Sequence, residues 1–121
     1  MAAGRFDWLV VTRRPITCGE GTETRLLVVR VEDRQGVPLP GIPLRVTWPG
    51  GEERFFTGLH ADDPGYADFA LTQEGRYALQ VDQGRSEIAL DLTTAQLAAQ
   101  CTDDVEPDRP IGWFVRFRRA R

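Results

Sequence analysis

Short segments of alternating apolar and polar residues, separated by turns of glycine and proline, recur along most of this sequence. In the clearest one, Leu44, Val46 and Trp48 share one face. Arg45 and Thr47 share the other. Because successive side chains of a strand point to opposite faces, this alternation predicts a strand with one buried and one solvated face. Strands this short and closely spaced are typical of a sandwich or a barrel.

Eight segments carry this strand pattern. They are 6–13, 24–33, 43–48, 52–57, 66–71, 77–81, 86–93 and 112–119. The segment 24–33 is apolar on both faces at its start, which predicts a central strand. Turns between neighbouring segments predict two hairpins, one over 43–57 and one over 66–81.

The end of this pattern contains the only predicted helix. In the segment 86–93 we expect Ile88, Leu90 and Leu92 to share one buried face. Thr94 can then cap one short helix over Ala95–Gln100, whose alanine, glutamine and leucine residues favour helices. With seven or eight strands and no long helix, a doubly wound parallel sheet is excluded.

Length and charge limit the possible classes of protein. The 121 residues suffice for one hydrophobic core, so we expect one domain over residues 1–121. All 15 basic residues are arginines, and the net charge of -3 gives no overall field that attracts nucleic acid or an acidic membrane. No apolar run approaches the roughly 20 residues that cross a bilayer. The start lacks the apolar stretch of a signal peptide, so we expect either an intracellular protein or a piece of a longer chain.

Four stretches in the middle of the chain carry a resemblance to a known family. They are Val29–Asp33, Gly36–Val46, Gly65–Phe69 and Gly75–Val81. Their turn glycines and alternating apolar residues resemble the carboxypeptidase-regulatory-like and collagen-binding B-type repeats. The resemblance implies an immunoglobulin-like or transthyretin-like antiparallel β-sandwich. Together with the strand pattern and the capped segment above, we expect seven or eight strands and one short helix near residues 94–100. It also implies an accessory module of a bacterial surface or secreted protein. The Lys–Asn isopeptide cross-link of that family is excluded, because the chain has neither residue.

Cys18 and Cys101 are the sharpest candidate feature. Each lies just outside a terminal strand, and the first and last strands of a sandwich can lie close together. We expect a disulfide between them, supported by the even cysteine count and the resemblance to surface proteins. The alternative is two unrelated reduced thiols. A bridge would indicate an extracellular or cell-surface location, whereas reduced thiols would indicate the cytoplasm.

His60, the only histidine, lies in the longest central loop beside Asp62 and Asp63, with Asp68 further on. A catalytic role needs a nucleophile within reach, and no Gly-x-Ser-x-Gly elbow is present around Ser86. The aspartates lack the Asp-x-Asp-x-Asp-Gly spacing of a calcium loop. We therefore expect a solvated loop, no metal and no cofactor.

Exposed aromatic rings are the remaining candidates for ligand binding. Phe55 and Phe56 are adjacent, so one ring points away from the core, and Tyr66 falls on the outer register of its strand. The candidate ligand-binding residues are therefore Phe55, His60, Asp62 and Tyr66.

The C-terminal segment is basic. Arg116 and Arg118 fall on one face of the last strand, where we interpret them as keeping a sheet edge soluble rather than binding nucleic acid.

Two functional hypotheses follow. The first is a non-enzymatic module of a bacterial surface or secreted protein, acting as a spacer or binding a cell-wall glycan or another surface protein. It involves no nucleic acid and no membrane insertion. The second is a small cytoplasmic enzyme or carrier that uses His60 and nearby carboxylates in a pocket.

Overall fold

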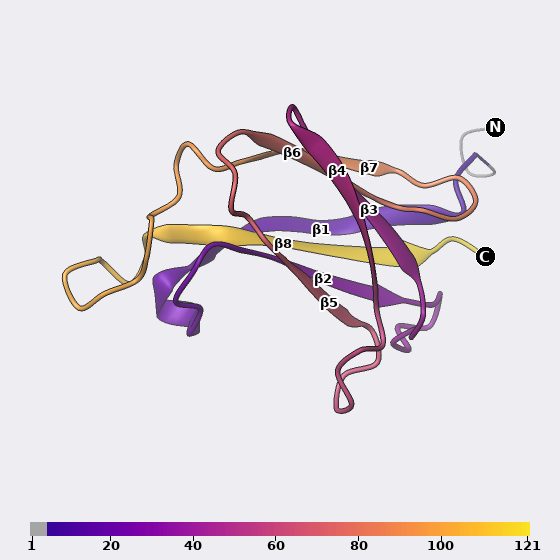
Figure 1. The fold of residues 1–121 in the computed structure, drawn as a ribbon. Helices are drawn as coiled ribbons and strands as arrows, with labels where there is room; N and C mark the ends of the chain where they lie inside the picture. Colours follow the sequence, from indigo (N-terminus) through magenta and orange to yellow (C-terminus); the bar gives the residue numbers. More distant parts are fainter. Residues whose placement is uncertain (1–4) are drawn as a thin grey trace.

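A computed structural model describes residues 5–121, which form eight strands in two four-stranded sheets (Figure 1). Sheet A has the order β1 (Trp8–Thr17), β8 (Pro110–Arg119), β2 (Leu26–Glu32) and β5 (Tyr66–Ala70). Sheet B has the order β4 (Gly51–Phe56), β3 (Pro43–Trp48), β6 (Arg76–Val81) and β7 (Ile88–Thr93). The prediction of an all-β sandwich is confirmed.

Strand β8 is central in sheet A. It pairs with β1 in antiparallel and with β2 in parallel orientation. The interpretation of Arg116 and Arg118 as residues of a sheet edge was therefore wrong, because β1 covers that side of the strand. At its start β8 approaches β2 so closely that a Cβ at Gly112 would lie 2.1 Å from the carbonyl oxygen of Leu26. The prediction of a central strand over 24–33 is confirmed by β2, which lies between β8 and β5.

One of the two predicted hairpins is present. Strands β3 and β4 pair in register from Pro43↔Phe56 to Trp48↔Gly51. The hairpin expected over 66–81 was wrong, because β5 pairs with β2 in sheet A and β6 pairs with β3 in sheet B. The turn between them crosses from one sheet to the other. The hydroxyl of Tyr77 fixes this crossing by donating to the carbonyl oxygen of Gln73 at 2.7 Å and accepting from its backbone N–H at 3.1 Å.

Strand β7 contains a bulge that changes which residues face the core. Its register jumps from Leu79↔Ala89 to Tyr77↔Leu92, so three steps on β7 match two on β6. Ala89 and Leu92 are buried, whereas Ile88 and Leu90 are 48% and 58% exposed. The expectation that Ile88, Leu90 and Leu92 share one face was therefore wrong.

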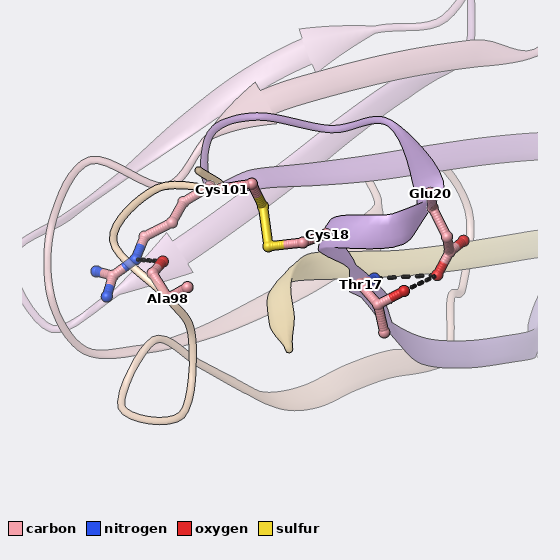
Figure 2. Close-up of a disulfide and its surroundings, with 6 residues drawn as sticks. Thr17, Cys18, Glu20, Ala98 and Cys101 are labelled. Carbon is pink, nitrogen blue, oxygen red and sulfur yellow. Dashed lines mark hydrogen bonds between the residues drawn. A yellow bond between two sulfur atoms is a disulfide. The ribbon is translucent and has the colours of Figure 1, made fainter. Parts of the chain in front are cut away.

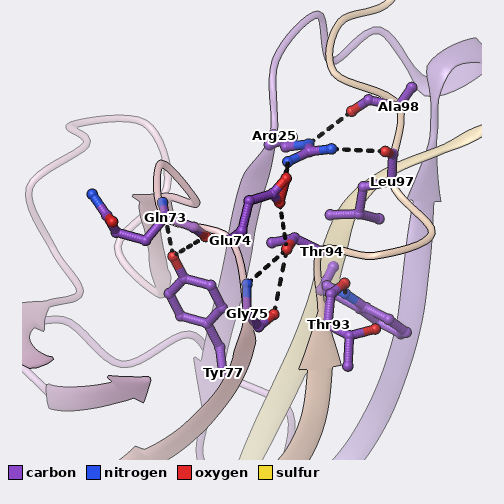
Figure 3. A network of polar contacts seen from close by, with 10 residues as sticks. Arg25, Gln73, Glu74, Gly75, Tyr77, Thr93, Thr94, Leu97 and Ala98 are labelled. Carbon is purple, nitrogen blue, oxygen red and sulfur yellow. Dashed lines mark hydrogen bonds and ion pairs between the residues drawn. The ribbon is translucent and has the colours of Figure 1, made fainter. Parts of the chain in front are cut away.

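The helix expected over Ala95–Gln100 is absent. The Leu97 N–H keeps one local hydrogen bond to the carbonyl of Thr94, but the Ala98 N–H donates to Pro110, and the Cys101 N–H, just after the segment, donates to Glu23. The carbonyls of Leu97 and Ala98 accept from the guanidinium of Arg25, each at 2.9 Å (Figure 3). These tertiary hydrogen bonds replace the helical ones, so they override the helix propensity of residues 95–100. Within residues 5–121 the helical element is instead the 3-10 turn η2 (Cys18–Glu20).

The inner faces of both sheets form the main core. Its largest fully buried side chains are Trp8, Tyr77, Phe117, Leu27, Leu44, Leu79 and Leu92. A second, smaller cluster is formed by Ile16, Ala98 and Ile111 and packs against both cysteines. The two ends of the described chain meet at the opposite end of the sandwich, where the Ala120 N–H donates to the Asp7 carbonyl at 2.7 Å (Figure 1).

Candidate functional site

A disulfide joins Cys18 and Cys101, as predicted. The sulfur atoms are 2.02 Å apart, and the bridge spans 83 residues of sequence. Cys18 begins η2 directly after β1, while Cys101 lies in the long connection between β7 and β8 (Figure 2). Both side chains are half-buried against the cluster of Ile16, Ala98 and Ile111. The bridge therefore ties that connection to the end of the first strand.

Hydrogen bonds hold the backbone on both sides of the disulfide. The Cys18 N–H donates to Arg109 and the Gly19 N–H to Pro107. The carboxylate of Glu20 accepts from the backbone N–H and the hydroxyl of Thr17, which closes the 3-10 turn (Figure 2). The backbone hydrogen bond from Thr17 is the main cause that lowers the pKa of Glu20. This end of the sandwich is thus built as one connected unit.

An open hollow lies beside the disulfide. It is lined by Cys18, Gly19, Gly21, Thr22, Glu23, Cys101, Thr102, Asp103, Asp104, Val105, Glu106 and Pro107. Its charged groups are all carboxylates. Among residues 5–121, no three His, Cys, Asp or Glu side chains are arranged to hold a metal ion.

The loop from Gly58 to Gly65 folds back onto the outer face of sheet A. The His60 ring meets the Tyr66 ring edge-on, with centroids 4.5 Å apart. The guanidinium of Arg30 lies 5.7 Å from the Tyr66 ring and forms an ion pair with Asp63. The Tyr66 hydroxyl donates to Asp68 at 2.7 Å. Burial is the main cause that raises the pKa of Tyr66 to about 12, and the hydrogen bond and charge of Asp68 add to it.

The four candidate ligand-binding residues do not form one surface. His60 and Tyr66 are in contact, and Asp62 is exposed in the same loop. Phe55 points the other way, into the space between the sheets, where its ring lies 5.7 Å from that of Phe69. Phe56 is instead the outward ring of this pair, with the guanidinium of Arg54 over it at 5.2 Å.

The surroundings of His60 supply no catalytic arrangement among the described residues. The side chain is exposed, and within residues 5–121 it makes no hydrogen bond to a hydroxyl, thiol or carboxylate. The single serine, Ser86, is used elsewhere, since its hydroxyl accepts from Val81 and donates to Glu87. A nucleophile and base acting together would need hydrogen-bond contact.

The structure brings together a group of residues that sequence reasoning missed. Parallel pairing of β2 with β8 places Arg30 beside Arg116 and Glu32 beside Arg118 on the outer face of sheet A. Glu32 accepts from Arg118 at 2.8 Å, and the Nε of Arg116 lies 3.9 Å from the same carboxylate. Alternation alone indicated that these side chains face outward. It could not indicate that β2 and β8 are neighbours.

Comparison of the chain with models of protein families, with curated proteins and with solved structures gives no match. Within the described residues, no helix is long and apolar enough to cross a membrane.

Proposed function

We propose that this chain is a non-enzymatic accessory module of a bacterial surface or secreted protein, acting as a binding unit for a cell-wall glycan or another surface protein. The Cys18–Cys101 disulfide is the observation that carries the proposal. Disulfides persist in oxidising compartments and are rare in the reducing cytosol. The resemblance of the turn segments to carboxypeptidase-regulatory-like repeats supports the same location.

The turn geometry supports a transthyretin-like or immunoglobulin-like sandwich. Gly36 and Gly41 adopt left-handed conformations, with φ of 87° and 73°. Residues with a Cβ rarely adopt such angles, so these glycines mark the turns that the resemblance requires.

The position of the chain ends favours a binding unit over an in-line spacer. Asp7 and Ala120 are hydrogen-bonded neighbours, so the chain enters and leaves the sandwich at one end. A spacer that extends a string of domains gains most length when the chain enters and leaves at opposite ends. A sandwich with adjacent ends projects sideways from its parent chain, which suits a pendant binding module.

The test uses the oxidised full chain. We expect it to be retained by insoluble bacterial cell walls or by at least one glycan of an array, and retention should persist after protein is stripped from the walls if the partner is a glycan. Absence of binding to untreated walls, stripped walls and glycans would overturn the binding role. A chain that carries reduced thiols after export to the cell surface would overturn the proposed location.

A further inference from the structure

We propose that the outer face of sheet A binds an anionic polysaccharide, with Arg30 and Arg116 contacting its carboxylates. The inference rests on the proposed function for its setting and names the ligand class. Arg30 on β2 and Arg116 on β8 occupy directly paired positions on neighbouring strands. Both side chains are exposed to solvent over more than a third of their surface. Like charges at paired positions destabilise a sheet unless anions compensate them.

Nearby carboxylates compensate the positive charges of Arg30 and Arg116 only in part. Arg30 is paired with Asp63. Among residues 5–121, Glu32 is the only carboxylate close to Arg116, but it is only 13% exposed and accepts two hydrogen bonds from Arg118. Arg116 is left with a 3.9 Å contact, and its Nε has no hydrogen-bond partner among the described residues although the atom is buried. A ligand cannot reach that buried atom, so it would contact the rest of the Arg116 guanidinium, whose side chain is 39% exposed.

Charges on the outer face of sheet A are balanced in number but unevenly distributed. The strand positions of the outer face carry four arginines, Arg14, Arg30, Arg116 and Arg118, against two carboxylates, Glu32 and Asp68. Two loop carboxylates, Asp63 and Glu20, pair with Arg30 and Arg14 at the rim. Arg14 and Arg30 thus each have their own carboxylate, whereas Arg116 and Arg118 share Glu32, and the local excess of positive charge lies at this pair.

The outer face of sheet B provides the contrast. Arg45 and Arg54 also sit at paired positions there. Asp82 lies between them, 3.3 Å from Arg45 and 2.9 Å from Arg54, and Glu52 adds a 4.0 Å contact. The Nε of Arg45 lacks a hydrogen bond, but its Nη2 has a direct carboxylate partner. This face needs no external anion.

Aromatic rings contact two of the four arginines on this face, Arg14 and Arg30. The guanidinium of Arg14 lies 5.1 Å from the Phe114 ring, and that of Arg30 lies 5.7 Å from the Tyr66 ring. Cation–π contacts of this kind orient a guanidinium before a ligand arrives. A fixed, planar guanidinium binds a carboxylate through two parallel hydrogen bonds.

These observations favour a polysaccharide over a nucleic acid. Single-stranded nucleic acid is bound by stacking its bases on open ring faces. The Tyr66 ring is already contacted by Arg30 and His60, and the Phe114 ring by Arg14. Neighbouring strands are about 4.8 Å apart, a distance comparable with the length of one sugar residue. Arg30 and Arg116 can therefore reach carboxylates of neighbouring sugars.

The experiment measures binding of the oxidised full chain to polygalacturonate and to uncharged dextran. We expect binding to polygalacturonate that weakens with added salt, and none to dextran. The double variant Arg30→Gln with Arg116→Gln should bind about tenfold more weakly, which corresponds to about 1.4 kcal/mol. The matched control, Arg45→Gln with Arg54→Gln, removes the same charge from sheet B and should stay within about twofold. Thermal unfolding of each variant verifies that it is folded.

The outcomes separate this inference from the proposed function. Equal weakening in both double variants, equal binding to dextran, or stronger binding to single-stranded DNA than to polygalacturonate would overturn the anionic-polysaccharide site. If the chain binds cell walls or a neutral glycan but not polygalacturonate, the inference fails and the proposed function stands. If it binds none of them, both fail. Arg30→Lys with Arg116→Lys keeps the charge and should bind between the wild type and the glutamine variant.

Discussion

Arg25 holds Glu74 through a two-pronged contact, with its Nη1 2.8 and 2.9 Å from the two carboxylate oxygens (Figure 3). The same guanidinium donates to the carbonyls of Leu97 and Ala98. Glu74 in turn accepts from the Thr94 hydroxyl at 2.8 Å. One side chain therefore links the start of β2, the crossing between sheets and the connection that carries Cys101.

Replacing Arg25 should destabilise the fold more than its single ion pair suggests. Arg25→Ala leaves two part-buried carbonyls, those of Leu97 and Ala98, without their donor. We expect the free energy of unfolding to fall by about 2 to 3 kcal/mol, measured by chemical denaturation. Arg76→Ala is the control, because within residues 5–121 the Arg76 side chain makes only an exposed 3.5 Å pair with Asp91, and its loss should cost less than about 1 kcal/mol. Equal losses in the two variants would contradict this role of Arg25.

The disulfide should contribute a large part of the stability. In the chain-entropy model, closing a loop of this length is worth about 4 to 5 kcal/mol. We expect reductant to lower the denaturation midpoint of the wild-type chain strongly. The variant Cys18→Ala with Cys101→Ala should resemble the reduced wild type and be insensitive to reductant. A wild-type midpoint that reductant leaves unchanged would show that the bridge is not formed in solution.

Tyr66 should resist ionisation in the folded protein. Its pKa is raised to about 12, mainly by burial and next by the hydrogen bond to Asp68. Because the folded state favours neutral tyrosine, this contribution to stability is complete below the unfolded pKa of about 10 and is lost as pH rises towards 12. Tyrosinate absorbance should therefore appear at higher pH in buffer than in denaturant. Burial also raises the pKa of Tyr77, so Tyr66→Phe assigns the two signals.

Asp68→Asn separates the causes of the Tyr66 shift. It removes a negative charge while keeping an oxygen that can accept from the hydroxyl. We expect the pKa of Tyr66 to fall towards its ordinary value without reaching it, because burial remains. A pKa that does not move would contradict the contribution of Asp68.

Local pattern predicted the strands well, and pairing over long distances could not be predicted. The alternation around Leu44 and Val46 and the turn at Gly50 and Gly51 were sufficient for the β3–β4 hairpin, because register there follows from the turn. Arg30 lies opposite Arg116 because β2 and β8 pair in parallel, although these strands lie far apart in the sequence. No periodicity encodes that pairing, so the grouping of Arg30, Arg116, Arg118 and Glu32 could not be foreseen.

Tertiary hydrogen bonds explain the two largest departures. The helix expected over 95–100 loses to donors and acceptors from Arg25, Pro110 and Glu23, none of which is local. At the bulge in β7, the guanidinium of Arg13 donates to the carbonyls of Leu90 and Asp91 at 2.9 and 2.8 Å, contacts that no local pattern indicates.

Asp91 provides a direct test of that bulge. It has a φ of 59°, a left-handed conformation that costs most residues about 1 kcal/mol and costs glycine little. Asp91→Gly and Asp91→Ala both remove the exposed pair with Arg76, so the difference between them reports the backbone alone. We expect the glycine variant to be more stable than the alanine variant by about 1 kcal/mol in chemical denaturation. Equal stability, or a more stable alanine variant, would mean that the chain does not keep this bulge in solution. The bulge would then not explain why Ile88 and Leu90 face outward.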